Sequence, residues 1–246
     1  TLTWNVGRVR ITRILERTIL GKISAILRPV DGQITPEAIA PYRQWLVPYF
    51  LDDNDQFVMS IQSFLIRSKG KNIIVDTGVG ETPAAYLKEA KPFSNSFLDD
   101  LAAAGFPRES IDVVVCTHLH DDHVGWNTMK SGTDSVPTFP KARYLIARGE
   151  YERCLANLAA NKPHMFNSIF SQTSKPIVDR GLADLVKAPY RITDEVRLEL
   201  TPGHTPWHVS VWVESDGERA LLTGDATHHP IQWAKPIFLY PIILQN

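Results

Sequence analysis

Short apolar runs separated by turn residues make up much of the chain, and they predict a protein rich in β-strands. From Val6 to Leu15, apolar residues alternate with arginines, as expected of a half-exposed strand. Two apolar runs on either side of Ser68-Lys69-Gly70 predict a β-hairpin over residues 57–76. We expect further strands at residues 142–147, 196–200, 209–213 and 220–223.

Helical patterns are fewer. Ser96-x-x-Asp99 resembles a capping box, and the amphipathic pattern that follows predicts a helix ending at Gly105. A second helix is expected from Glu150 to about residue 160. No internal repeat or domain boundary is visible, so we predict one α/β domain over residues 1–246.

Two segments broken by prolines fit neither pattern. Residues 35–55 carry several aromatic side chains, Tyr42, Trp45 and Tyr49 among them, ahead of an acidic run. We interpret this segment as a packed surface loop, a lid or a dimer contact, and the sequence leaves the three open. Residues 161–189 form the second segment, a candidate border of a substrate cleft.

The chemistry is concentrated where one apolar run ends. Residues 113–116 predict a buried strand, and His118, His120, Asp122 and His123 follow directly. His118 and His120 are two residues apart, so in an extended segment their side chains leave the same side of the backbone. Imidazole and carboxylate bind hard or borderline cations. A solvated histidine-rich loop is the alternative, but three of the eight histidines at this spacing favour a metal site.

The stretch His118-x-His120-x-Asp122-His123, preceded by Thr117, resembles the signature of the metallo-β-lactamase superfamily of hydrolases. Two later motifs match the family pattern in order. Residues 201–206, with His204, are similar to its third-histidine loop, and residues 221–225 to its bridging-aspartate strand end. The resemblance spans roughly residues 57–230. It implies a four-layer αββα sandwich of two mixed β-sheets with flanking helices, and ligands at one edge where strands end.

The resemblance also implies a ligand set and a cofactor of two divalent metal ions, with zinc expected. His118, His120 and His204 would hold the first ion. Asp122 and His123 would hold the second, and Asp225 would bridge the two. Asp122 and Asp225 are the expected catalytic residues, with Asp122 orienting the nucleophile or passing a proton to the leaving group.

Neighbouring residues receive supporting roles. Asp76 ends the predicted hairpin and is interpreted as a carboxylate that caps a turn or holds a ligand in place. Asp121 points away from the ligands in an extended segment, so we expect it in solvent or behind a ligand. His208 is expected to form structural hydrogen bonds. Trp126 and Trp207 are expected to pack rather than to form a substrate wall.

One part of the family pattern is missing. Dinuclear members close the second site with another histidine some tens of residues after the bridging aspartate, but only 21 residues follow Asp225. His228 and His229 are among these residues and come too soon for that position. We therefore expect a longer native chain that supplies the ligand, the last strand and the last helix; entry of His228 or His229 is the second route. A second ion with three protein ligands is expected to be labile.

The implied function is hydrolysis. Asp225 stands where the β-lactam-hydrolysing branch most often has cysteine, so the sequence is more similar to the lactonase, thioester-hydrolase and phosphotriesterase branches. We expect a metal-bound hydroxide to open a lactone, ester or organophosphate-like small molecule. Two alternatives stay open: a mononuclear iron dioxygenase of the same fold acting on a persulfide, and a non-catalytic binding scaffold.

The composition adds little to this picture. With 43% hydrophobic residues, 22% charged residues and a net charge of −1, the chain offers no electrostatic case for nucleic acid or an anionic membrane. No apolar run has the length of a transmembrane helix. Cys116 and Cys154 are not spaced as in a disulfide framework or a zinc knuckle. The expected location is cytoplasmic, and the expected partners are a small-molecule substrate and, in a homodimer, a second copy of the chain.

Overall fold

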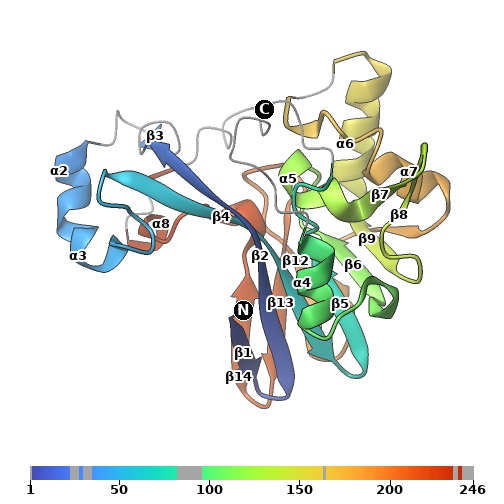
Figure 1. Cartoon of the computed structure of the whole chain (residues 1–246), viewed down its shortest axis with the longest axis horizontal. Coiled ribbons are helices and arrows are strands. Elements are labelled where there is room, and N and C mark those ends of the chain that lie inside the picture. The colour runs from blue at the N-terminus through green and yellow to red at the C-terminus, as the bar shows by residue number, and fades with distance from the viewer. Residues whose placement is uncertain are drawn as a thin grey trace.

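The computed structural model describes residues 2–22, 28–29, 35–81, 96–162, 165–234 and 238–239. Its largest element is a seven-stranded mixed sheet (Figure 1). Across the sheet the strands are β1 (Thr3–Val6), β2 (Val9–Lys22), β4 (Gln56–Ser68), β5 (Lys71–Val75), β6 (Val113–Cys116), β9 (Arg143–Ala147) and β10 (Ala183–Val186). Pairing is antiparallel from β1 to β5 and parallel from β5 to β10.

The second sheet has four strands: β11 (Tyr190–Arg191), β12 (Val196–Leu200), β13 (Val209–Ser215) and β14 (Glu218–Leu222). Its pairings are all antiparallel, whereas two mixed sheets were predicted. The reason is local. Short connections, such as Asp216-Gly217 between β13 and β14, return the chain beside the strand it has just left, and parallel pairing would need a longer crossover.

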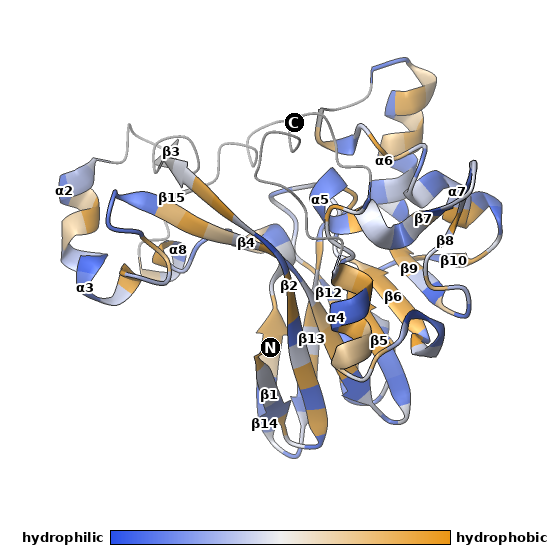
Figure 2. Ribbon diagram, in the orientation of Figure 1, coloured by the Kyte–Doolittle hydropathy of each residue, from blue (hydrophilic) through white to orange (hydrophobic). Residues whose placement is uncertain are grey.

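The two sheets pack face to face through aliphatic side chains. Val115 and Leu145 of the large sheet share one buried cluster with Val196, Val211 and Val213 of the small one. All four residues of β6 are buried, because this parallel strand is covered on both faces. Figure 2 shows β6 as a hydrophobic strand inside the molecule.

Helices cover the other face of the large sheet. They are α4 (Phe97–Ala103), α6 (Arg148–Ala159) and α7 (Ser174–Asp179), whose Phe97, Tyr151 and Ile177 join one buried cluster with the sheet. The expected capping box at α4 is wrong. Ser96 has helical dihedral angles (φ −81°, ψ −3°) instead of the extended ones that an N-cap needs, and its hydroxyl donates to Asp100 instead.

These clusters confirm the expected α/β sandwich. Among the described residues, no hydrophobic cluster joins a helix to the outer face of the small sheet. That outer face carries charged side chains instead, with Arg197 and Arg219 both paired to Glu214.

Strands β2 and β4 run on beyond the sandwich as a two-stranded arm, on the left in Figure 1. At its far end α2 (Pro36–Ile39), α3 (Arg43–Leu46) and α8 (Ile231–Ala234) surround a small core that includes Ile39, Leu46, Phe57 and Ile231. The interpretation of residues 35–55 as an irregular loop is therefore wrong for residues 36–46. Pro36 stands at the first turn of α2 and Thr35 caps it, so this proline starts a helix instead of breaking one. A lid or dimer role for the segment stays a prediction.

The remaining short elements complete the surface. A hairpin of β7 (Thr128–Ser131) and β8 (Asp134–Pro137) follows the ligand loop, and β3 (Arg28–Pro29) pairs with β15 (Phe238–Leu239). Short 3₁₀ turns cover residues 40–42, 108–110, 125–127, 165–167 and 224–226. None of the helices in the described ranges has the length and apolar character needed to cross a membrane.

Candidate metal centre

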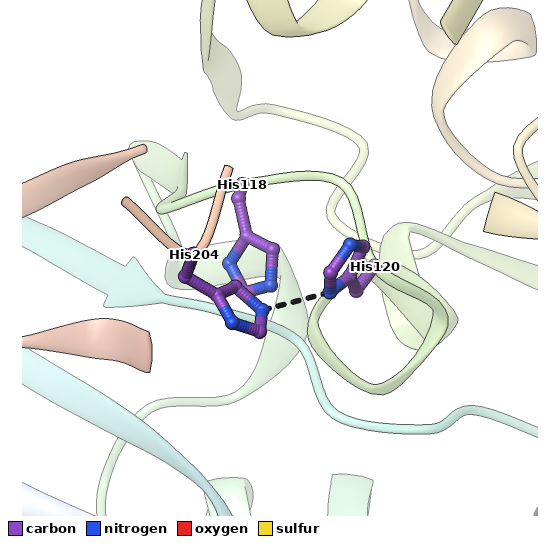
Figure 3. A group of neighbouring side chains, drawn as sticks. All are labelled: His118, His120 and His204. Atoms are coloured by element: carbon purple, nitrogen blue, oxygen red, sulfur yellow. Dashed lines mark hydrogen bonds between the residues drawn. The ribbon is translucent and has the colours of Figure 1, made fainter. Parts of the chain in front are cut away.

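Three histidines from two separate loops meet at one end of the sandwich (Figure 3). His118 and His120 lie between β6 and the short helix α5 (Asp121–Val124), and His204 lies between β12 and β13. Their ligand nitrogens all lie within 4.8 Å of one another, and all three residues are buried. His204 Nε2 and His120 Nδ1 are 2.9 Å apart, so the two rings already face a common point.

Asp225 lies between these histidines and a second group of donors. Its Oδ2 is 3.4 Å from His204 Nε2 and 4.0 Å from His118 Nε2. Its Oδ1 is 3.3 Å from His123 Nε2, which in turn lies 3.7 Å from Asp122 Oδ2. One carboxylate therefore faces both groups, which is the geometry that a bridging ligand needs.

Burial sets the charge of the three histidines. Removal from water disfavours the charged ring and lowers the pKa of His118 and of His120 well below the ordinary value of 6.5. Burial also lowers the pKa of His204 to about 3. The three imidazoles are therefore neutral at pH 7, the form in which histidine binds a metal.

In the second group of donors, charged neighbours oppose the effect of burial on each pKa. Burial alone would lower the pKa of His123, but the surrounding carboxylates, Asp225 first, outweigh it and raise this pKa well above the ordinary value. Burial alone would raise the pKa of Asp225, but His123 and His228 together outweigh it and hold the pKa of that carboxyl well below its usual range. At Asp122 burial prevails and raises the pKa. These carboxylates thus attract positive charge into the site, and a divalent ion would supply it.

A metal fits this donor set. His118 Nε2 is buried, faces Asp225, and has no hydrogen-bond partner within the described ranges, although such an atom is costly to leave unsatisfied. Imidazole nitrogens and carboxylate oxygens at these separations are the ligands that zinc and similar cations take.

Asp76 holds the ligand loop in place. Its Oδ1 accepts a hydrogen bond from Thr117 N, and its Oδ2 accepts from the Thr117 hydroxyl and from His123 Nδ1, all at 2.8 Å. This carboxylate lies at the end of β5, and its neighbour β6 leads into the ligand loop. The predicted supporting role of Asp76 matches these contacts.

His208 links the two later motifs. Its Nε2 accepts the backbone N–H of Asp225 at 3.0 Å, so its Nδ1 carries the proton and donates to Thr201 Oγ1 at 2.8 Å. Gly224 makes this contact possible, since its φ is +52° and a Cβ there would lie 2.8 Å from His208 Nε2. The expected structural role of His208 matches this geometry.

Asp121 is not in solvent, so that part of its interpretation is wrong. The side chain is fully buried, and it accepts hydrogen bonds from Ser168 N, Ser168 Oγ and Ile169 N. Burial raises its pKa. It turns away from the ligands as expected, but it meets the segment before α7, which sequence spacing did not show.

Glu16 is a supporting residue that the sequence did not reveal. Its carboxylate on β2 accepts hydrogen bonds from Val79 N at 2.6 Å, Gly80 N at 3.3 Å and Trp126 Nε1 at 2.7 Å. The loop it holds is bonded to the end of α5, because Gly125 N donates to Gly78 O. The one available signal was a glutamate within an alternating strand, which does not reveal partners 63 and 110 residues away.

His228 and His229 separate into different environments. His228 Nε2 lies 3.1 Å from Asp225 Oδ2, within the centre, although its short distance along the chain had argued against this position. The His229 ring stacks on Phe57 with centroids 4.0 Å apart, and its Nε2 lies 2.8 Å from Phe50 O. His164 lies outside the described residues.

A pocket of about 380 Å³ opens beside these donors. The site supplies Asp122, His123 and Asp225 to its wall, and the arm supplies apolar residues such as Met59 and Ile61. Phe166 borders it too, so part of residues 161–189 does line the cleft. Trp126 packs as expected, buried and stacked on Phe97. The Trp207 ring lies against Gly149 but stays 42% exposed, so its packing is only partial.

The chain is similar to known proteins of one family. Residues 57–241 match the metallo-beta-lactamase superfamily. The N-acyl homoserine lactonase of Bacillus thuringiensis is 23% identical over 186 residues, which cover 69% of this chain and 65% of that protein. A probable metallo-hydrolase of Bacillus subtilis (strain 168) is 26% identical over 168 residues, 67% of this chain and 61% of that protein. The chain therefore spans less than two thirds of the length of these relatives.

Solved structures share the fold. The hydrolase AbOPH, of the beta lactamase superfamily, has a TM-score of 0.71 and 24% identity over 98% of this chain and 79% of that one. A probable metal-dependent hydrolase from Staphylococcus aureus has a TM-score of 0.65 and 20% identity, covering 90% and 74%. AidC, a dizinc quorum-quenching lactonase, has a TM-score of 0.64 and 20% identity, covering 89% and 72%. At such identities the likeness shows the fold.

Proposed function

Because the chain belongs to the metallo-β-lactamase superfamily, we propose that it is a metal-dependent hydrolase that opens a lactone, ester or organophosphate-like small molecule. One observation carries the proposal: six donor side chains from three separate strand ends gather beside a single pocket. They are His118, His120, Asp122, His123, His204 and Asp225.

The donors would suit two zinc ions. His118, His120 and His204 would hold the first and Asp122 and His123 the second, with Asp225 placed between the two groups. Divalent ions bound there would polarise the substrate carbonyl or phosphoryl oxygen and lower the pKa of coordinated water from 15.7 to roughly 7.

Asp122 is the residue we assign to proton transfer. It lines the pocket, and its Oδ2 lies 3.7 Å from His123 Nε2, so it reaches both the ligands and a bound molecule. From this position its carboxylate orients the nucleophile or passes a proton to the leaving oxygen. Asp76, His208 and Glu16 act through the ligand loops, which they hold in place.

The pocket favours a small substrate with an apolar part. Its volume of about 380 Å³ lies in the range of small-molecule sites. Its lining combines the polar donors with Ile19, Met59 and Ile61 of the arm. The relatives named as N-acyl homoserine lactonases support a lactone as the first candidate.

Two other functions fit less well. An iron dioxygenase with one metal leaves no task for Asp122 and His123, which stand beside Asp225 with a separation fit for a second ion. A non-catalytic scaffold does not account for a complete first ligand set that adjoins an open pocket.

The test is hydrolysis by zinc-loaded protein, followed by proton release in a pH-stat. The panel contains N-acyl homoserine lactones, aryl esters and a phosphotriester. We expect turnover of at least one class, and Asp122→Asn to lower kcat roughly 10²- to 10⁴-fold. Asp99→Asn, on the exposed side of α4, is the matched control and should leave kcat unchanged. Absence of turnover across the panel, or iron-dependent oxidation of a persulfide instead, would reject the proposal.

A further inference from the structure

His228 lies in the candidate metal centre, although it belongs to none of the three matched sequence motifs. Its Nε2 lies 3.1 Å from Asp225 Oδ2, and its ring centroid lies 4.8 Å from that of His204. The ligand atoms of His204, Asp225 and His228 form a group within 4.8 Å of one another. His228 also lines the substrate pocket.

The backbone around His228 fixes this position. Gln232 Oε1 accepts the backbone N–H of His228 at 2.7 Å and that of His229 at 3.0 Å. Gln232 belongs to α8, which is anchored by Ile231 in the core of the arm. With both amides held by one side chain, the two imidazoles go opposite ways: the ring of His229 packs on Phe57 and the ring of His228 faces Asp225.

The spacing of these atoms suits a shared ion. Two neighbouring ligands of one zinc, each bound at about 2.1 Å, stand roughly 3.0–3.4 Å apart, depending on whether the ion has five or four ligands. Asp225 Oδ2 lies 3.1 Å from His228 Nε2 and 3.4 Å from His204 Nε2, within that range on both sides. Oδ1 of the same carboxylate faces His123 and is left for the other ion.

We infer that His228 is a further protein ligand of the metal centre, bound on the Oδ2 side of Asp225 beside His204. This inference rests on the metal site of the proposed function, but not on the substrate. It makes α8 and the arm part of the metal site, because the turn that presents His228 is held by Gln232. The arm then supports both the apolar wall of the pocket and one ligand.

The experiment counts zinc in wild-type protein and in His228→Ala, His228→Gln and His229→Ala variants during dialysis against graded chelator. We expect His228→Ala to lose one zinc equivalent at a chelator concentration at least about 10-fold lower than wild type does. The absorption spectrum of its cobalt-substituted form should also change. His229→Ala, which removes the neighbouring imidazole from the arm core, should keep the wild-type zinc profile even if its Tm falls.

His228→Gln separates ligation from hydrogen bonding. An amide N–H can still donate to Asp225 but does not ligate zinc as imidazole does, so this variant should lose zinc as His228→Ala does. Wild-type zinc retention in His228→Gln, or in His228→Ala with an unchanged cobalt spectrum, would overturn the inference. If zinc-loaded wild type hydrolyses nothing in the panel, the proposed function is rejected. Zinc retention in the His228 variants then still decides whether His228 is a ligand.

Discussion

His123 Nδ1 lies 2.8 Å from Asp76 Oδ2, and because a carboxylate only accepts, the ring donates there and turns Nε2 towards Asp225. Asp76 also accepts the backbone N–H and the hydroxyl of Thr117, the residue before His118. One carboxylate at the end of β5 thus fixes the tautomer of a proposed ligand and the start of the loop that carries three others.

Asp76→Asn is predicted to weaken zinc binding. Its φ of +57° suits asparagine as well as aspartate, so the backbone should hold. The amide nitrogen of asparagine opposite His123 Nδ1 donates a hydrogen bond and cannot accept one. The His123 ring then carries its proton on Nε2, which no longer has a free lone pair for zinc. We expect zinc affinity to fall about 10- to 100-fold, measured by competition with a chelator.

Glu195→Gln is the control for Asp76→Asn. Glu195 is another buried carboxylate that accepts from side chains, Ser68 and Ser215, but it lies near the start of β5 instead of its end. Its variant should lower the Tm and leave zinc affinity unchanged. Equal loss of zinc in both variants would mean that general destabilisation, and not the orientation of His123, explains the effect.

Gly224→Ala is predicted to damage the site through its backbone. A methyl group there would lie 2.8 Å from His208 Nε2 and 3.0 Å from Thr117 Cβ, in a residue with φ of +52°. Gly217→Ala has the same kind of φ (+83°) but nothing within 4 Å, so it should cost only about 1–2 kcal/mol of strain. Urea denaturation should show a larger loss for Gly224→Ala, and zinc counting should show lost metal in that variant alone. Equal losses in the two would show that the contact with His208 is unimportant.

Glu16→Gln is predicted to loosen the loop behind α5. Gln Oε1 can still accept from Trp126 Nε1, but its amide would face Val79 N, a donor that lies 2.6 Å from the carboxylate in this structure. One lost acceptor at a partly buried site should cost about 1–3 kcal/mol in urea denaturation. Glu152→Gln on the exposed face of α6 should change stability by less than about 0.5 kcal/mol. An unchanged free energy of unfolding for Glu16→Gln would remove this residue from the support of the site.

The gathering of the candidate ligands on one loop was predictable because its signal is local. A buried run followed by His118, His120, Asp122 and His123 within six residues shows both the strand and the donors that leave it. Most strands of the sandwich were equally visible, since alternation and turn residues are properties of neighbouring positions. Strand β10 was not, because it lies within residues 161–189, where no strand was predicted.

Long-range contacts were less predictable. Asp121 was placed in solvent because its direction could be inferred but its partner, Ser168, could not. Glu16 gave no sign of the backbone amides it holds, and the turn that directs His228 depends on Gln232 three and four residues later. Periodicity and motif spacing do not show which distant segments of the chain are in contact. The roles of these supporting residues depend on such contacts.

The most direct test of metal-dependent hydrolysis is a zinc titration of chelator-stripped protein, in which lactone hydrolysis and bound zinc are measured in the same samples. We predict no hydrolysis without zinc, a rate that rises with bound zinc up to two equivalents per chain, and an Asp225→Asn variant that binds less zinc and stays inactive. Full turnover by stripped protein, or near-normal turnover by Asp225→Asn, would contradict this prediction.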